Sequence, residues 1–355
     1  MVVVILAFFM FEGLASTVFV AHKIMASRPL TERLHTKYDE ELGWINIPNL
    51  HIENMYGSGK YLKTNSQSFR NNKDFEANIK DHRVRIVCSG DSFTLGYGVD
   101  NDHTWCHILT LIDTRLETVN MGQGGYGIDQ SYLWYKRNNT IIDHDIHVFA
   151  FVTNDFNRME SSRFLGYGKP ILELHDGILR PKNIPVPRRS FYVPWLTHIV
   201  NGIGDLSSLK LLAKLREKIF TGSETQASSS QTNDIVINVF EELYRISRSK
   251  NSILVLVYLP TSYDHTGSGS HIWRRFIDTH LAKDKIVYID LIEDFKNVPP
   301  QEIKKMFISP EVLDYQYAAG HYTEEGNAYI AEMLYKKLIA IPQISKKLME
   351  RSGQN

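Results

Sequence analysis

The strongest signal for the fold is Val84-Arg85-Ile86-Val87-Cys88-Ser89-Gly90-Asp91-Ser92, where an apolar run is followed by a glycine turn. Similar apolar runs lie at 146–152, 252–259 and 286–291, and a weaker one lies at 117–121. Helix-like segments separate these runs, and this alternation predicts a parallel sheet covered by helices on both faces. We therefore expect an α/β fold with three layers, α/β/α, around a central parallel five-stranded sheet.

Ser92 stands where the first of these expected strands ends. Reactive groups in open parallel sheets collect beyond the carboxyl ends of the strands. A small neighbour such as Gly90 lets backbone N–H groups come close to a substrate oxygen. A serine in this position is equally typical of a helix N-cap in an ordinary strand-to-helix turn. The stretch alone therefore leaves open whether Ser92 is a nucleophile or a cap.

Two later segments end at the same edge of the expected sheet. Four glycines lie within 122–127, after the weak strand, and Asn154-Asp155 follows the strand at 146–152. Exposed backbone N–H groups at the glycines, or the Asn154 amide, can donate to a developing oxyanion. The structural alternatives are a tight glycine turn and an ordinary Asn-Asp turn.

A histidine occupies a fourth position of interest. His321 precedes a helix expected over 328–338, and Thr323 can cap that helix. Such a histidine is well placed for a general base, although a lone histidine is more often a surface or packing residue.

The order of these four segments resembles the SGNH family of GDSL-type esterases and lipases. The resemblance spans residues 84–338 and implies a flavodoxin-like fold with Ser92 as nucleophile and His321 as base. It implies an oxyanion hole made by Ser92, Gly125 and Asn154. The serine, glycine, asparagine and histidine blocks of the family match Gly90-Asp91-Ser92, residues 120–125, Asn154-Asp155, and His321 with Gly326.

The chain departs from the family pattern at two points. Ala318 and Ala319 stand where the family usually has the aspartate that orients the histidine. Asp314 is then the candidate for that acid, and a backbone carbonyl that orients Nδ1 is the alternative. Val152 replaces a common glycine, and we expect it to narrow the approach to Asn154.

The family resemblance implies a serine ester hydrolase that works through an acyl-enzyme, with no metal and no organic cofactor. O-acyl esters, acetyl above all, of an envelope glycan are the expected substrates. An O-acyltransferase of the same family is one alternative. The missing aspartate motivates another, a non-catalytic descendant that binds glycan as a scaffold.

Composition and motifs argue against several other classes of protein. Forty basic and forty acidic residues cancel, so no net positive field favours nucleic acid. Neither a dinucleotide fingerprint nor a nucleotide-triphosphate loop is found. The two cysteines are too few for a disulfide framework, and Cys88 is expected to be a buried free thiol.

The N-terminal segment 1–23 has the length and apolar character of a membrane-spanning helix, with Glu12 as its only charge before residue 22. We expect a transmembrane anchor or an uncleaved signal, which would place the remaining chain outside the cytoplasm; a buried core helix is the alternative. Residues 24–80 are expected to form a polar, irregular leader that packs onto the domain. Within them, 42–44, 64–66 and 69–70 resemble the leader of membrane-anchored family members.

The expected catalytic domain spans 81–345 and carries an insertion at about 160–248. Within it we expect an extended segment at Pro181–Pro194, a short helix at Ser207–Phe220, and a mobile linker at Thr221–Asn233. Such an insertion either shapes a substrate cleft or is decorative.

Overall fold

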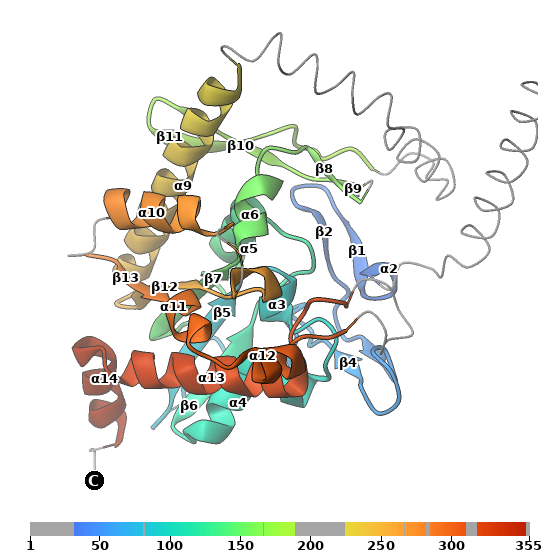
Figure 1. Cartoon of the computed structure of the whole chain (residues 1–355), viewed down its shortest axis with the longest axis vertical. Coiled ribbons are helices and arrows are strands. Elements are labelled where there is room, and N and C mark those ends of the chain that lie inside the picture. The colour runs from blue at the N-terminus through green and yellow to red at the C-terminus, as the bar shows by residue number, and fades with distance from the viewer. Residues whose placement is uncertain are drawn as a thin grey trace, which may run out of the picture. The chain divides into compact units, whose positions relative to one another are not determined.

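A computed structural model of the chain describes residues 32–80, 82–165, 167–188, 224–265, 267, 269–281, 285–309 and 318–352 (Figure 1). The expected membrane segment at 1–23, the expected helix at Ser207–Phe220 and the candidate acid Asp314 lie outside the described residues. Residues 31–188 and 231–355 make up one compact unit, which contains the sheet and the candidate site.

A five-stranded sheet forms the centre of this unit. All of its neighbouring strands are parallel, and the order across the sheet is β13-β12-β7-β5-β6. Counted along the chain and read from the β6 edge, this is the flavodoxin-like order 2-1-3-4-5. The expected fold class is confirmed, including the weak strand. The strands are β5 (Val84–Ser89), β6 (Leu116–Asn120), β7 (Ile146–Phe151), β12 (Ile253–Tyr258) and β13 (Val287–Asp290).

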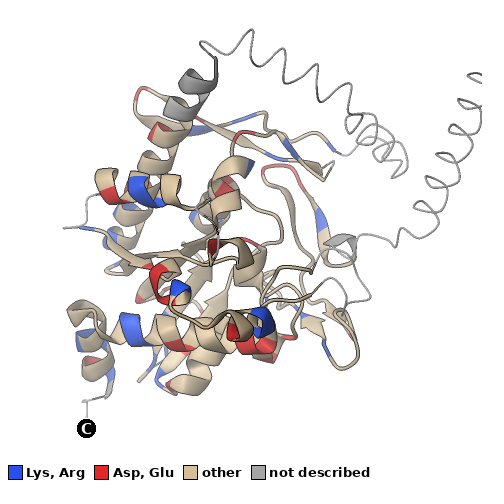
Figure 2. Cartoon of the chain, viewed as in Figure 1, with Lys and Arg blue, Asp and Glu red and all other residues tan. Residues whose placement is uncertain are grey.

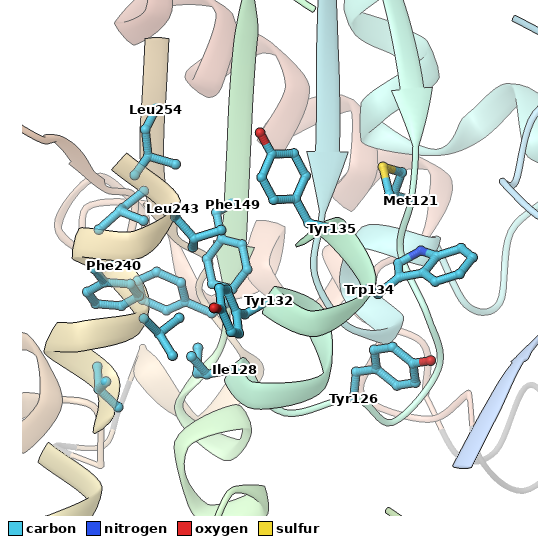
Figure 3. Close-up of a cluster of buried hydrophobic side chains, with 14 of the residues drawn as sticks. Met121, Tyr126, Ile128, Tyr132, Trp134, Tyr135, Phe149, Phe240, Leu243 and Leu254 are labelled. Atoms are coloured by element: carbon cyan, nitrogen blue, oxygen red, sulfur yellow. The ribbon is translucent and has the colours of Figure 1, made fainter. Parts of the chain in front are cut away.

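Helices cover both faces of the sheet (Figure 1). Alternate residues of β7 enter opposite cores: Phe149 and Phe151 face one helix layer, and Val148 and Ala150 face the other. Figure 3 shows Phe149 beside Phe240 and other side chains of the first core. The first layer contains α5 (Ile128–Asn138), α9 (Glu224–Ser249) and α10 (His271–His280); the second contains α4 (Trp105–Ile112), α12 (Pro300–Met306), α13 (Glu324–Ile339) and α14 (Pro342–Ser352).

Short elements surround the sheet. The leader forms two antiparallel strand pairs, and the first part of the insertion forms two more. The leader elements are α2 (Glu32–His35), β1 (Thr36–Asp39), β2 (Gly43–Asn46), β3 (His51–Ile52) and β4 (Leu62–Lys63); those of the insertion are β8 (Arg163–Phe164), β9 (Tyr167–Gly168), β10 (Ile171–His175) and β11 (Ile178–Lys182); the rest are α3 (Ser92–Leu95), α6 (Thr153–Arg158), α11 (Ile292–Lys296), and 3-10 turns at Asn101–His103 and Ser262–Asp264.

The leader is more ordered than its polar, irregular sequence indicates. All four residues of β2 are buried, and Trp44 and Phe69 belong to the first core. The leader also covers the open edge of the sheet, where the Arg70 N–H donates to Asn120 O at 2.9 Å. The Asn71 side chain accepts from Asn120 N at 2.9 Å and donates to Thr118 O at 3.2 Å. Unpaired groups of β6 are thereby satisfied without a further strand.

The prediction of a mobile linker at Thr221–Asn233 is wrong from Glu224 onward, because helix α9 begins at that residue. Its later turns bury Ile235, Val236, Val239 and Phe240 against the sheet, a helical spacing. Once this face is packed, the helix can extend toward its N-terminus through serines and glutamines that do not favour it by themselves.

Acidic and basic residues are interspersed along the described elements, as Figure 2 shows. None of the helices in the described part of the chain combines the length and apolar character needed to span a bilayer. Both cysteines are buried and free, as expected for Cys88.

Candidate active site

The turn after β5 places Ser92 at the first position of α3. Gly90 is required there, since a Cβ atom at this position would lie 2.4 Å from Ala150 O of the neighbouring strand. Asp91 is the N-cap, and its carboxylate accepts from Phe93 N at 2.8 Å. The capping role therefore belongs to Asp91, and the hydroxyl of Ser92 is left for other contacts. The turn lies at the switch point between β5 and β7, where open sheets of this order bind ligands.

His321 faces Ser92 across this turn. Its Nε2 atom lies 2.8 Å from Ser92 Oγ, although 229 positions separate the two residues in the chain. The Ser92 hydroxyl also lies 3.3 Å from Asp91 Oδ2, a longer and weaker contact. The ring of His321 packs against Phe93 and Tyr97, at centroid distances of 4.8 and 5.3 Å. The structure thus brings the predicted nucleophile and the predicted base within hydrogen-bond reach.

Backbone hydrogen bonds fix the loop that carries His321. The His321 carbonyl accepts from Ile308 N at 2.8 Å, and Gly320 N donates to Ile308 O at 2.9 Å. After the histidine, Thr323 caps α13 by accepting from Gly326 N at 3.1 Å, which confirms the expected cap. Both flanks of His321 are therefore anchored, so its ring position is well defined.

The other ring nitrogen of His321 lies 3.2 Å from the carbonyl oxygen of Ala318. A proton on Nδ1 can be donated to this carbonyl, and Nε2 is then the unprotonated nitrogen that accepts from Ser92. This contact corresponds to the alternative in which a backbone carbonyl orients the ring. Whether Asp314 also contributes stays a prediction, because it lies outside the described residues.

The glycine block supplies a possible donor to an oxyanion. Gly125 has φ of 76°, a left-handed conformation that favours glycine. Within the described part of the chain, the backbone N–H groups of Ser92 and Gly125 donate no hydrogen bond, so both are available to a ligand. The Trp44 indole donates to Gly124 O at 2.8 Å and fixes the peptide that ends at Gly125 N.

Asn154 lies in the first turn of α6, directly after β7, and is exposed. It shares the carboxyl edge of the sheet with Ser92, because β5 and β7 are parallel neighbours. The Val152 side chain is fully buried in the second core, and its effect on the approach to Asn154 stays a prediction. Its backbone N–H donates to Asp155 Oδ2 at 3.0 Å and shapes the turn.

Arg158 was not found by sequence reasoning, yet it joins the serine block, the asparagine block and the residue that follows the glycine block. Its Nη1 atom donates to Asp91 Oδ2 at 3.0 Å, to Asp155 Oδ1 at 2.6 Å and to Tyr126 O at 3.0 Å. Burial, followed by the charge of Asp91, raises the pKa of the Asp155 carboxyl well above its usual range. The only sequence signal is an arginine three residues after Asp155 on a short helix.

Arg70 of the leader holds the other end of α3. Its buried guanidinium donates to Leu95 O at 2.7 Å and Gly96 O at 2.6 Å, and Nε donates to Asn101 Oδ1 at 2.9 Å. The last carbonyls of a helix lack partners within it, so this cation satisfies groups that would otherwise be unpaired. Arg70 and Asp91 thus secure α3 at its two ends.

Among the residues that the structure describes, one group of side chains could hold a metal ion. Asp100, His103 and Glu324 bring their ligand atoms within 4.8 Å of one another. Lys60 Nζ already lies 3.0 Å from Glu324 Oε1, and His103 Nδ1 lies 2.8 Å from Asp100 Oδ2. Glu324 therefore already has a cationic partner, Lys60, from the chain itself, and the donor set does not point to a resident metal.

No protein family and no curated protein matches this sequence. Among solved structures, a member of the lipolytic protein G-D-S-L family from Veillonella parvula is 13% identical, covers 72% of this chain and 100% of its own, and has a TM-score of 0.40. The acetyl xylan esterase AlAXEase is 14% identical, with the same coverages and TM-score. A lipase/acylhydrolase from Enterococcus faecalis is 14% identical, covers 72% and 96%, and has a TM-score of 0.35. None of these similarities assigns the chemistry of Ser92.

Proposed function

We propose that this chain is a serine ester hydrolase that acts through a Ser92–His321 acyl-enzyme mechanism. The observation that carries the proposal is the 2.8 Å contact between Ser92 Oγ and His321 Nε2 at the switch point of the sheet. A hydroxyl becomes a useful nucleophile when a neighbouring base can take its proton, and this geometry meets that requirement.

In the proposed reaction, Ser92 Oγ attacks the carbonyl carbon of an ester while His321 Nε2 takes the hydroxyl proton. The negative oxygen of the tetrahedral intermediate binds to the N–H groups of Ser92 and Gly125 and to the Asn154 amide. His321 then gives its proton to the leaving alcohol, and the acyl group stays on Ser92. Water, activated by His321, attacks this acyl-enzyme and releases the carboxylic acid.

We further propose acetyl esters on an envelope glycan as substrates, with the chain anchored through residues 1–23 and its catalytic unit outside the cytoplasm. The apolar character of this segment supports the anchor. A sugar hydroxyl in place of water would make the same site an O-acyltransferase, and the identity of the acceptor distinguishes the two activities. Protease protection of the anchored chain in sealed vesicles tests its orientation.

Hydrolysis of p-nitrophenyl acetate by the full chain tests the proposal. Ser92→Ala is expected to lower kcat by about 10³-fold or more, because only the oxyanion donors remain. Ser131→Ala, a buried serine of α5, is the matched control and is expected to keep the wild-type rate. Equal rates for wild type and Ser92→Ala would contradict the proposal and favour a non-catalytic binding protein.

The role of Asp314 is tested in the same assay. If Asp314 orients His321, Asp314→Asn lowers kcat strongly, since loss of the third member of a triad costs about 10⁴-fold in a serine protease. An unchanged rate would leave the Ala318 carbonyl as the group that orients the ring.

A further inference from the structure

A small aromatic hollow adjoins the glycine block. Its walls include Trp44 of β2, Gly124, and the segment Phe164, Leu165 and Tyr167 around the β8–β9 turn. The leader and the insertion thus each contribute a wall, and the glycine between them precedes the proposed oxyanion donor. No step of the mechanism above uses this hollow.

Phe164 is held close to the oxyanion side of the site. A Cβ atom on Gly125 would lie 2.2 Å from Phe164 Cε1, so the ring rests against the Gly125 backbone. The Phe164 ring also stacks on Trp44, with centroids 6.0 Å apart and planes at 26°. The guanidinium carbon of Arg158 lies 5.2 Å from the centroid of the same ring. These contacts fix a bulky apolar group next to Gly125.

The hollow is small, and its lining is mainly apolar, with His35 and Thr36 of the leader as its polar side chains. The indole N–H of Trp44 donates to Gly124 O, so Trp44 lines the hollow with the carbon atoms of its ring. Tyr167 packs against Trp44 at a centroid distance of 5.8 Å. About 20 Å³ is open to a water-sized group, and a single water occupies about 10–15 Å³ on this measure. The space therefore fits one group of about the size of a methyl.

We propose that this hollow, which we call the acyl pocket, receives the substituent on the substrate's carbonyl carbon and selects acetyl esters. The inference rests on the proposed function. With the carbonyl oxygen bound at the Gly125 N–H and the alcohol directed toward His321, the acyl substituent needs a third direction, and the acyl pocket adjoins Gly125. A methyl fits there, whereas a longer chain must displace Phe164 or Tyr167.

Chain-length preference tests the acyl pocket. The full chain is assayed for kcat/KM on p-nitrophenyl acetate, butyrate and octanoate. The wild type is expected to prefer acetate to butyrate by about tenfold or more, the scale at which pockets discriminate by a few methylenes. Phe164→Ala is expected to raise kcat/KM for butyrate relative to kcat/KM for acetate by about tenfold. Phe164→Leu, which keeps more of the packing, is expected to change the ratio in the same direction.

Tyr263→Ala is the matched control, since this aromatic residue is 81% exposed and does not line the acyl pocket. Its acetate-to-butyrate ratio is expected to equal that of the wild type. Equal use of octanoate and acetate by the wild type, or a uniform loss on all three esters in both Phe164 variants, would overturn the proposal. Turnover that persists in Ser92→Ala would contradict the proposed function. Turnover that depends on Ser92 but has the same kcat/KM for all three esters would contradict the acyl pocket alone. Absence of turnover on all three esters would contradict both.

Discussion

Arg158 is a single residue whose contacts stabilise the candidate site. It is the cation between Asp91 and Asp155, whose carboxylates are buried beside the nucleophile. Arg158→Met leaves these carboxylates without their partner, and we expect a loss of about 3–5 kcal/mol in the free energy of unfolding near pH 7. Burial raises the pKa of the Asp155 carboxyl and Arg158 lowers it, so removal of this cation raises that pKa further, and the loss of stability is expected to shrink as the pH falls.

Urea unfolding of wild type and Arg158→Met at pH 7 and pH 5 measures this difference. Arg163→Met, at an exposed arginine of β8, is the control and is expected to unfold like the wild type. An Arg158→Met protein with wild-type stability at pH 7 would contradict the role assigned to the cation.

His144 gives the fold a dependence on pH. Its Nε2 atom lies 2.9 Å from Tyr135 Oη, and burial lowers the pKa of the imidazole from 6.5 to about 4. Between pH 4 and pH 6.5 the imidazole is therefore protonated in the unfolded chain and unprotonated in the folded chain. Stability attributable to this group is present above pH 6.5 and falls as the pH drops toward 4, by up to about 3 kcal/mol.

His144→Gln has no titrating group and keeps polar atoms for Tyr135. The fall in stability between pH 7.5 and pH 5, measured by urea unfolding, is expected to be smaller in this variant than in the wild type. An identical fall in both proteins would show that His144 is not responsible.

At the scale of an element, β2 of the leader sets the geometry of the glycine block. Trp44 donates to Gly124 O, and Tyr126 Oη donates back to Trp44 O. Trp44→Phe keeps an aromatic ring but removes the donor that fixes the Gly124–Gly125 peptide. We expect kcat for p-nitrophenyl acetate to fall about tenfold with little change in KM, because an oxyanion donor acts mainly in the transition state.

Trp134→Phe is the control for this variant. The Trp134 indole N–H is buried and has no hydrogen-bond partner within the described residues, so its loss removes no positioning contact. A Trp44→Phe protein with unchanged kcat, or one in which only KM rises, would contradict the assignment.

The elements differ in how far the sequence predicts them. The parallel strands were predictable, because continuous apolar runs such as 146–152 are buried on both faces. Ser92, Asn154 and His321 were found as candidates because each follows a strand or precedes a helix at one edge of the sheet. The choice of Gly125 among the four glycines, and the role of each residue, came from the family resemblance. Arg158, Arg70 and Trp44 were not assigned their contacts, since each acts through partners that only the folded chain brings together. The start of α9 was missed because tertiary packing outweighs local composition there.

At the scale of the whole molecule, the leader is part of the folded unit. It contributes Trp44 and Phe69 to the core, covers the edge strand β6, and places Arg70 at α3. Removal of residues 1–80 is therefore expected to abolish cooperative urea unfolding, monitored by near-UV circular dichroism. A chain that begins at residue 31 serves as the control and is expected to unfold cooperatively. Equal unfolding midpoints for the two would show that the leader is dispensable.

The proposed mechanism depends on one oxygen atom, Ser92 Oγ, and on its base, His321. Treatment of the full chain with a fluorophosphonate, followed by mass spectrometry of its peptides, reports directly on whether Ser92 Oγ is an activated nucleophile. We predict one phosphonyl group on the peptide that contains Ser92, none in Ser92→Ala, and labelling slowed by a factor of about 10² or more in His321→Gln, since the positioned base is lost. An unlabelled wild-type Ser92, or a labelling rate unaffected by His321→Gln, would contradict the proposed mechanism.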